Sequence, residues 1–291
     1  MRFRNSVLYG DALTRLRDLP DDCVQTCVTS PPYFHQRNYG HADQIGMEAT
    51  VDEYIDALVD VFGEVRRVLR PDGTCWINIA DSYVDKRLLL VPSRLALALA
   101  NAGWVLRSDI IYAKLNPYLE NAGDRPDRAH EYVFMFSREP RYYYAPDAVR
   151  VPRGRLARTK PGVRTFKRHN LDGSVRWARG RISLAPDRRM NTVWTMASVN
   201  GVSSHTSRFP IELARRCILF GSRPQDLVLD PFAGSGTTLA VARWLERDFV
   251  GVELNEQHCR PEIEERLRLA DRRIVELEAF RHLVGQMRTG T

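Results

Sequence analysis

The sequence predicts an α/β core with a mostly parallel, doubly wound sheet. Short runs rich in β-branched and aromatic residues alternate with segments whose apolar residues recur at helical spacing. Such alternation is typical of a parallel sheet with helices on both faces. Two unusual loops, Thr29-Ser30-Pro31-Pro32-Tyr33 and Asp230-Pro231-Phe232-Ala233-Gly234-Ser235-Gly236, each follow a β-rich run. Because ligands of open α/β sheets bind at the carboxyl ends of the strands, we expect both loops at the binding edge.

Local patterns define the individual elements. The double proline ends a strand over 24–28, because the residue before a proline avoids helical backbone. Apolar residues at helical spacing predict a helix over 51–69, and Pro71-Asp72-Gly73 predicts a turn after it. Gly103 and Gly221 stand just past two further helices. The remaining expected elements are strands over 6–9, 74–79, 105–112, 131–136, 227–229 and 249–252, and helices over 92–101, 210–220, 237–246 and 262–286.

The composition predicts a soluble protein of the cytoplasm. The chain has 291 residues, of which 44% are hydrophobic, and this is ample for a buried core. No apolar run reaches the length of a signal peptide or of a membrane span. The spacing of the five cysteines matches no common zinc site, so we expect reduced thiols and no metal.

Positive charge is concentrated in one segment. From Arg150 to Met190 the chain has thirteen Lys or Arg residues against only Asp172 and Asp187, although the net charge of the whole chain is +7. Regular periodicity fails in the same segment, where Gly, Pro and Arg dominate. A solvated basic loop would have this composition, and so would a surface that exchanges counterions for phosphates. Beside the two loops, we favour contact with DNA.

The two loops together resemble signatures of the S-adenosylmethionine-dependent enzymes that methylate the exocyclic amino group of a DNA base. Ser30-Pro31-Pro32-Tyr33 is similar to the (D/N/S)-P-P-(Y/F) motif of that family. The catalytic motif precedes the cofactor loop, an order that resembles the circularly permuted β group. A Ser in first place resembles the cytosine-N4 enzymes of restriction-modification systems. The resemblance covers residues 5–258, is weakest across roughly 145–190, and implies a Rossmann-like methyltransferase fold.

The resemblance implies that Ser30, Pro31, Pro32 and Tyr33 are the catalytic residues. The amino nitrogen of cytosine or adenine is a poor nucleophile, because its lone pair is delocalised into the ring. The Ser30 hydroxyl and the Pro31 carbonyl can accept hydrogen bonds from its two N–H groups and draw the nitrogen toward tetrahedral geometry. Pro32 stiffens the loop, and Tyr33 offers an aromatic face on which a flipped-out base can stack. The methyl group would then pass by direct displacement from the sulfonium.

The glycine loop is predicted to bind the cofactor, S-adenosylmethionine. A strand, the loop and a helix N-terminus place backbone N–H groups where a ligand can approach closely. No Lys follows Gly236 as in a P-loop, and Leu239 stands where a dinucleotide loop has its third glycine, so phosphate binding is disfavoured. Glu253 ends the next strand and can accept both ribose hydroxyls. The resemblance assigns cofactor binding to Asp11, Asp230, Phe232, Gly234, Gly236, Thr237 and Glu253, although a helix cap explains Asp11 equally well.

DNA contact is assigned mainly to the basic segment. The candidate DNA-binding residues are Arg37, Lys114, Arg153, Arg155, Arg158, Lys160, Arg164, Lys167 and Arg168. The chain is therefore divided into a catalytic half (1–144), a basic, irregular target-recognition insertion (145–190), a cofactor-binding half (191–258) and a C-terminal helical segment (259–291). Pro261 is expected to interrupt this last helix, which is a candidate dimer contact.

These observations predict a site-specific DNA methyltransferase acting on cytosine N4 in double-stranded DNA, in the cytoplasm and associated with the nucleoid. Adenine N6 remains the nearest alternative, and an RNA or protein amide methyltransferase or a non-catalytic DNA-binding protein is favoured less. The sequence contains no Pro-Cys dipeptide, which argues against cytosine C5 methylation through a covalent thiolate. Whether a cognate restriction endonuclease exists is left open, and so is the role of Asp81, which can line the base pocket or cap local structure.

Overall fold

The computed structural model describes residues 3–36, 41, 44–117, 120–152, 163–169, 174–181, 187–197 and 209–288. The chain forms two compact units, of which one holds Met1–Ala145 and Thr192–Thr291 and the other holds Pro146–Asn191. Both signature loops belong to the larger unit, which therefore carries the candidate site.

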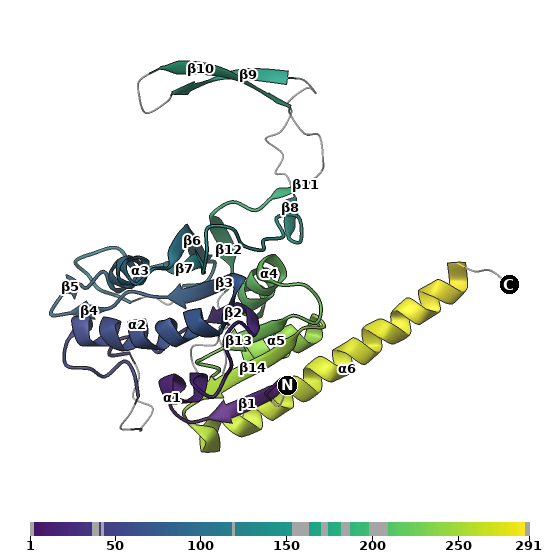
Figure 1. The fold of residues 1–291 in the computed structure, drawn as a ribbon. Coiled ribbons are helices and arrows are strands. Elements are labelled where there is room, and N and C mark those ends of the chain that lie inside the picture. Colours follow the sequence, from purple (N-terminus) through teal and green to yellow (C-terminus); the bar gives the residue numbers. More distant parts are fainter. Residues whose placement is uncertain are drawn as a thin grey trace. The chain divides into compact units, whose positions relative to one another are not determined.

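The larger unit is built on an eight-stranded sheet with the order β1-β14-β13-β2-β3-β7-β6-β12 (Figure 1). Its strands are β1 (Ser6–Tyr9), β2 (Val24–Thr29), β3 (Leu69–Ile79), β6 (Val105–Lys114), β7 (His130–Ser137), β12 (Val193–Met196), β13 (Leu227–Asp230) and β14 (Asp248–Glu253). Strand β7 pairs antiparallel with both of its neighbours, whereas all other neighbouring strands are parallel. The mostly parallel sheet predicted from the sequence is confirmed.

Helices cover both faces of this sheet (Figure 1). The helices on one face are α1 (Ala12–Leu16), α2 (Val51–Val68) and α3 (Val91–Asn101), and those on the other are α4 (Ile211–Gly221), α5 (Thr237–Trp244) and α6 (Glu256–Arg288). Within each set, consecutive helices pack side by side. The predicted doubly wound α/β fold is confirmed. None of the described helices has the length and apolar character needed to cross a membrane.

Helix α2 shows how the local sequence builds an element that also supports the site. Thr50 and Glu53 form a reciprocal capping box, which satisfies backbone N–H groups that a helix start leaves free. Tyr54, Leu58 and their neighbours at helical spacing are buried against the core. The hydroxyl of Tyr54 donates to the carbonyl of Pro32 over 2.7 Å. The first turn of α2 therefore holds the Ser-Pro-Pro-Tyr loop in place.

Two strands near the centre of the sheet are buried along their whole length. Both β2 and β13 have every residue buried, as parallel strands covered on two faces require. Strand β3 is assigned from Leu69, but its pairing with β2 shifts between Leu69 and Thr74, so the predicted turn at 71–73 becomes an irregularity within the strand. All five cysteines are free thiols, and each of them except Cys23 is buried.

Helix α6 corrects the prediction that Pro261 interrupts the C-terminal helix. The helix begins at Glu256 and continues through Pro261 to Arg288. A proline inside a helix removes one backbone hydrogen bond, but Cys259 and Ile263 are buried on either side of it. Their packing holds the helical backbone although that bond is missing. The side chains of the outer part of α6 lie outside the described residues, so its role in a dimer stays a prediction.

Two short elements of the larger unit were not predicted from the sequence. Strand β12 pairs parallel with β6 and adds an edge to the sheet. Its alternating pattern is short, with Trp194 and Met196 buried and Val193 and Thr195 exposed, and a four-residue alternation is easily missed. A hairpin of β4 (Tyr83–Val84) and β5 (Arg87–Leu88) follows β3.

The smaller unit contains regular strands, which corrects the prediction of an irregular insertion. Strand β8 (Arg150–Pro152) pairs antiparallel with β11 (Asp187–Arg189), and β9 (Val163–His169) pairs with β10 (Val175–Arg181) over seven residues. Basic residues occupy positions where a half-buried strand would show apolar alternation. The backbone can pair without that alternation, so the hydrophobic pattern failed to reveal these strands.

Candidate active site

The two signature loops meet in the middle of the sheet. Strands β13 and β2 are neighbours in the sheet. The strand that follows β13 in sequence, β14, lies on one side of this pair, and the strand that follows β2, β3, lies on the other, so the strand order reverses between β13 and β2. At the ends of these two strands, Oγ1 of Thr29 donates a hydrogen bond to Oδ1 of Asp230 over 2.6 Å. Open α/β sheets bind ligands in the crevice at such a reversal. This one bond ties the Ser-Pro-Pro-Tyr loop to the glycine loop at the predicted edge.

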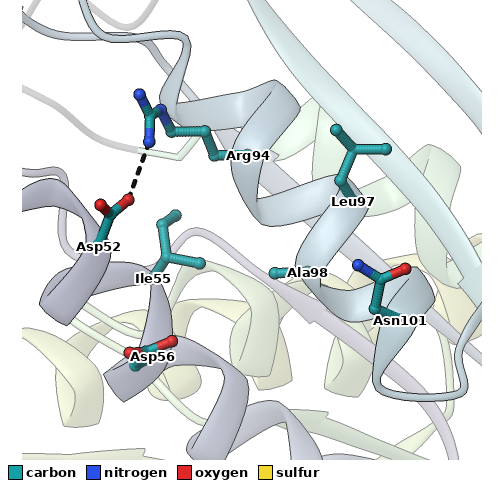
Figure 2. Close-up of a pocket in the computed structure, with 7 residues that line it drawn as sticks. All are labelled: Asp52, Ile55, Asp56, Arg94, Leu97, Ala98 and Asn101. Atoms are coloured by element: carbon teal, nitrogen blue, oxygen red, sulfur yellow. Dashed lines mark hydrogen bonds and ion pairs between the residues drawn. The ribbon is translucent and has the colours of Figure 1, made fainter.

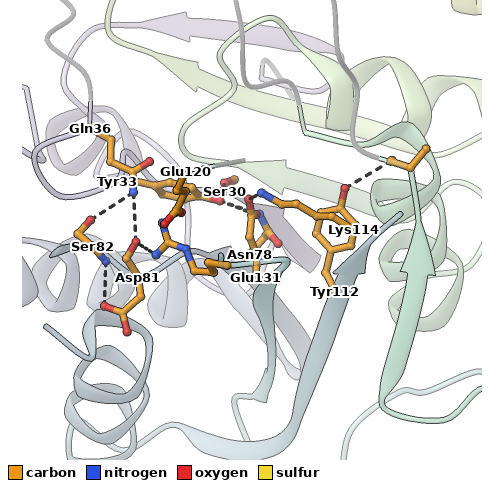
Figure 3. A network of polar contacts seen from close by, with 12 residues as sticks. Ser30, Tyr33, Gln36, Asn78, Asp81, Ser82, Tyr112, Lys114, Glu120 and Glu131 are labelled. Atoms are coloured by element: carbon orange, nitrogen blue, oxygen red, sulfur yellow. Dashed lines mark hydrogen bonds and ion pairs between the residues drawn. The ribbon is translucent and has the colours of Figure 1, made fainter. Parts of the chain in front are cut away.

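A network of polar contacts surrounds the Ser30 hydroxyl (Figure 3). The Ser30 hydroxyl lies 3.2 Å from the Tyr33 hydroxyl, which lies 2.9 Å from Oε2 of Glu131. Nδ2 of Asn78 donates both to the Tyr33 oxygen over 2.8 Å and to Oε2 of Glu131 over 2.7 Å. Nζ of Lys114 forms an ion pair with Oε1 of Glu131 at 2.6 Å. Ser30 is therefore linked to a paired carboxylate through one tyrosine.

Glu131 reaches this network because β7 runs against its neighbours. The start of an antiparallel strand lies at the edge where its parallel neighbours end, and Glu131 is the second residue of β7. Asn78 stands near the end of β3, and Lys114 ends β6. Neither Asn78 nor Glu131 was predicted from the sequence, although polar residues at neighbouring strand ends were an available signal. Lys114 was assigned to DNA, and the structure pairs this cation with Glu131.

The Tyr33 hydroxyl stays protonated in this environment. Burial and, second, the negative charge of Glu131 raise the pKa of Tyr33 well above its ordinary value of 10.0. A neutral hydroxyl has a proton to donate, and the Glu131 carboxylate can only accept. Tyr33 therefore acts as a hydrogen-bond donor toward Glu131, whether or not its ring also stacks on a base as predicted.

Asp230 is a buried carboxylate without an ionic partner among the described residues. Burial raises the pKa of Asp230 to about 6, although hydrogen bonds from Thr29 and from the backbone N–H of Phe232 oppose that shift. A carboxylate held this way favours a cationic ligand, because a positive charge would offset the cost of burying the negative one. The predicted role of Asp230 in binding S-adenosylmethionine, which carries an ammonium and a sulfonium group, fits this chemistry.

Glu253 is held by two backbone groups. Its Oε2 accepts from the N–H of Gly234 over 2.7 Å, and its Oε1 accepts from the N–H of Asn255 over 2.8 Å. Each carboxylate oxygen keeps a further lone pair, so two ribose hydroxyls can still donate to it. The carbonyl of Glu253 accepts from the N–H of Gly10 over 2.9 Å, which brings the end of β1 beside the end of β14.

The other predicted cofactor residues occupy different settings. Asp11 caps α1, since its Oδ1 accepts from the N–H and the hydroxyl of Thr14, and a second role toward the cofactor stays a prediction. Phe232 is half-buried and packs against the core. Thr237 is buried, and its hydroxyl accepts from Arg266 over 3.2 Å. The Thr237 side chain thus already has a structural partner in α6.

The two glycines of the loop have different neighbours. Both Gly234 and Gly236 have positive φ, at 52° and 78°. A Cβ on Gly234 would meet only the carbonyl oxygen of Phe232, at 4.0 Å, so open space lies there. A Cβ on Gly236 would lie 3.1 Å from Cγ1 and 3.3 Å from Cα of Ile263. The close approach predicted at Gly236 is therefore made by α6, and Gly234 faces the space that a ligand can use.

This difference predicts opposite results for Gly234→Ala and Gly236→Ala. Gly236→Ala should lower the free energy of unfolding by roughly 1–3 kcal/mol, because left-handed backbone and the contact with Ile263 both oppose a Cβ. Gly234→Ala should lose less stability but should bind S-adenosylmethionine more weakly. Chemical denaturation and calorimetry on both variants make the comparison. Weaker cofactor binding in the folded Gly236→Ala protein alone would contradict this assignment.

Asp81 has a structural role. Its Oδ1 accepts from the backbone N–H of Ser82 over 2.9 Å, and its carbonyl accepts from Gln36 over 3.2 Å (Figure 3). The same Oδ1 also accepts from the backbone N–H of Val91 over 3.0 Å. The contact with Val91 caps the start of α3, where the side chain of Leu90 cannot. Of the two roles open from the sequence, local capping is the one that these contacts support.

An open groove of about 380 Å³ lies between α2 and α3 (Figure 2). An ion pair of 2.8 Å between Arg94 and Asp52 bridges the two helices beside it. The groove is lined by Asp52, Ile55, Asp56, Arg94, Leu97, Ala98 and Asn101. None of the lining residues belongs to either signature loop, so the predicted chemistry is not located there.

Several predicted DNA contacts lie outside the described residues. These are Arg37, Arg153, Arg155, Arg158 and Lys160. For Arg164, Lys167 and Arg168 the structure describes the backbone, which belongs to β9. Their contact with DNA stays a prediction.

Comparison with known proteins places these features in a family context. A family model described as DNA methylase matches residues 24–265. The Type II methyltransferase M.SmaI of Serratia marcescens is 37% identical over 282 residues, which cover 87% of this chain and 87% of the relative. M.Cfr9I of Citrobacter freundii, also a Type II methyltransferase, is 36% identical over 282 residues, with 87% and 84% covered.

Solved structures of similar fold include two methylases. PvuII DNA methyltransferase, named as cytosine-N4-specific, matches with a TM-score of 0.66 at 18% identity, and 93% of each chain is covered. TTHA0409 of Thermus thermophilus, a putative DNA modification methylase complexed with S-adenosyl-L-methionine, matches with a TM-score of 0.61 at 26% identity, with 91% of this chain and 95% of that chain covered. The Rossmann-like methyltransferase fold implied by the sequence is confirmed.

Proposed function

We propose that this chain, which belongs to the N6/N4 DNA methylase family, transfers a methyl group from S-adenosylmethionine to the N4 amino group of a flipped-out cytosine in double-stranded DNA. The observation that carries the proposal is the hydrogen bond between Thr29 and Asp230, which joins the catalytic and cofactor loops at the strand-order reversal. Transfer requires the methyl donor and the target amine to be adjacent, and this bond fixes the two loops side by side.

The residues of the glycine loop fit S-adenosylmethionine. That cofactor supplies an electrophilic methyl group on a sulfonium. Asp230 would hold the methionyl ammonium, Glu253 would accept the ribose hydroxyls, and the open space at Gly234 would admit the ligand close to the backbone. The complex of TTHA0409 with S-adenosyl-L-methionine supports this choice of cofactor.

Ser30 and Pro31 would bind the target amine. When two oxygens accept hydrogen bonds from its two N–H groups, the nitrogen lone pair becomes available for attack on the methyl group. A base inside a duplex cannot reach this loop, so it would be extruded and held on the Tyr33 ring.

Two observations favour cytosine N4 over adenine N6. Ser stands first in the Ser30-Pro31-Pro32-Tyr33 motif, as in the cytosine-N4 enzymes that it resembles, and the structurally similar PvuII enzyme is named as cytosine-N4-specific. The family model includes both classes by name. The names of the Type II relatives further support a place in a restriction-modification system.

Nucleoside analysis tests the proposal directly. The protein would be incubated with S-adenosylmethionine and unmethylated genomic DNA, and the hydrolysed DNA would be analysed by mass spectrometry. We expect N4-methyldeoxycytidine. N6-methyldeoxyadenosine would instead support the adenine alternative, and no methylated nucleoside would overturn both.

The basic segment predicts a salt-dependent contribution to DNA binding. Replacing Arg164, Lys167 and Arg168 together by Ala should weaken DNA affinity and flatten the slope of log affinity against log salt. Each phosphate contact that the replacement removes should change that slope by about 0.9, because each such contact releases counterions. Fluorescence anisotropy across a salt series measures both quantities. Wild-type affinity and slope in the triple variant would exclude these residues from the DNA interface.

Single variants separate positioning from base reading. Replacing a residue that reads a base should weaken the binding free energy by about 1–3 kcal/mol on cognate DNA and by much less on random DNA. Replacing a residue that contacts a phosphate should weaken binding equally on cognate and on random DNA. The control is a triple Ala replacement of exposed arginines outside the segment, Arg17, Arg268 and Arg272, which should leave the slope unchanged.

A further inference from the structure

We propose that Glu131 is a positioning residue that acts through Tyr33 to hold the Ser30 hydroxyl as a hydrogen-bond acceptor toward the target amine. The inference rests on the proposed methyl transfer. It assigns a role to a residue of β7 that lies outside both signature loops and far from them in sequence.

The direction of each hydrogen bond follows from the donors and acceptors present. The Glu131 carboxylate only accepts, so the Tyr33 proton points to Glu131 over 2.9 Å. The amide nitrogen of Asn78 only donates, so it occupies a lone pair of the Tyr33 oxygen over 2.8 Å. The Tyr33 oxygen can then only accept from Ser30, 3.2 Å away. The Ser30 proton therefore points toward Tyr33, and both Ser30 lone pairs remain for the target.

The surroundings stabilise this direction. The side chain of Glu131 is 12% exposed, and the ammonium of Lys114 at 2.6 Å supplies its counter-charge. Asn78 keeps its amide nitrogen on Glu131 and Tyr33 although its Oδ1 is buried without a hydrogen-bond partner among the described residues. Because a carboxylate can only accept, the amide nitrogen of Asn78, and not its oxygen, must face Glu131.

An acceptor at Ser30 is what the proposed reaction needs. As the amino nitrogen attacks the methyl group it gains positive charge, so the hydrogen bond that its N–H group donates to Ser30 becomes stronger. A contact that strengthens toward the transition state raises kcat. If the Ser30 proton turned toward the amine, it would compete for the lone pair that must attack. Without Glu131, the Tyr33 proton is free to point at Ser30 and to impose that wrong orientation.

A double-mutant cycle tests the route from Glu131 through Tyr33. Glu131→Ala and Tyr33→Phe should each lower kcat roughly tenfold or more, which is less than the about 10²–10³ expected when a direct contact is removed. KM for DNA and the affinity for S-adenosylmethionine should change little. The Glu131→Ala change should cost little more in the Tyr33→Phe background, because the hydroxyl through which it acts is already gone. Independent, multiplicative effects, or normal turnover in Glu131→Ala, would overturn the inference.

Further variants keep the test decisive. Glu131→Gln retains an acceptor oxygen for Tyr33, so its kcat should lie between those of wild type and Glu131→Ala. If Glu131→Ala does not fold, the same cycle with Glu131→Gln decides the question. Asp109→Ala removes an exposed carboxylate from the adjoining strand β6 and should behave as wild type. An active wild type with an equally active Glu131→Ala variant would sink this inference alone, whereas an inactive wild type would overturn the proposed function as well.

Discussion

Replacing Ser30 by Ala is expected to lower kcat for methyl transfer by about 10²–10³. The Ser30 hydroxyl donates to Tyr33, and in the proposed mechanism its lone pairs accept from the target amine. Alanine removes that acceptor, and nothing else in the loop replaces it. The affinity for S-adenosylmethionine should be nearly unchanged, because Ser30 belongs to the catalytic loop and the predicted cofactor contacts come from the glycine loop and β14.

Single-turnover kinetics with saturating cofactor would measure this effect separately from product release. Calorimetry would give the cofactor affinity. A matched control is Ser108→Ala, which removes a hydroxyl from β6 outside the network and should retain wild-type turnover. Near-normal turnover in Ser30→Ala would exclude Ser30 as the acceptor for the target amine.

Asp230→Asn is expected to stabilise the ligand-free protein at neutral pH while weakening cofactor binding. Burial raises the pKa of Asp230 to about 6 from its ordinary 3.8, and this difference corresponds to about 3 kcal/mol. The folded state therefore holds a proton more tightly than the unfolded state. This group's contribution to stability falls as pH rises from about 4 through 6 and stays low above that range. Asparagine removes the charge, so that decline should disappear.

The cost of burying Asp230 has a functional counterpart. A cationic group of the cofactor would offset the buried negative charge, so the wild type should gain more stability from S-adenosylmethionine than Asp230→Asn does. Denaturant unfolding at pH 5 and pH 7.5, with and without cofactor, compares the two proteins. Asp60→Asn, on the exposed side of α2, is the control and should keep the wild-type pH dependence. Equal cofactor affinity in wild type and Asp230→Asn would contradict the role of this carboxylate.

Much of the core was predictable because its signals are local. Helix α2 shows apolar residues at helical spacing and a capping box within its own sequence, and the prolines after Thr29 end a strand by backbone sterics. In a parallel sheet the ends of such strands share one edge, so the two signature loops could be placed there before any contact was known. The residue types of the loops then indicated the chemistry.

The sequence by itself determined the core helices, the main core strands and the positions of the two signature loops, because each depends on neighbours within one turn or one strand. The short strand β12 and the strands of the smaller unit were missed, because they lack a clear apolar alternation. Only the tertiary structure decided which distant residues meet. Glu131 reaches Tyr33 because β7 is antiparallel, and Lys114 pairs with Glu131 because β6 ends at the same edge. Gly236 is close to Ile263 because α6 packs there. These contacts join segments far apart in the chain, and a local pattern has no physical means of encoding such partners.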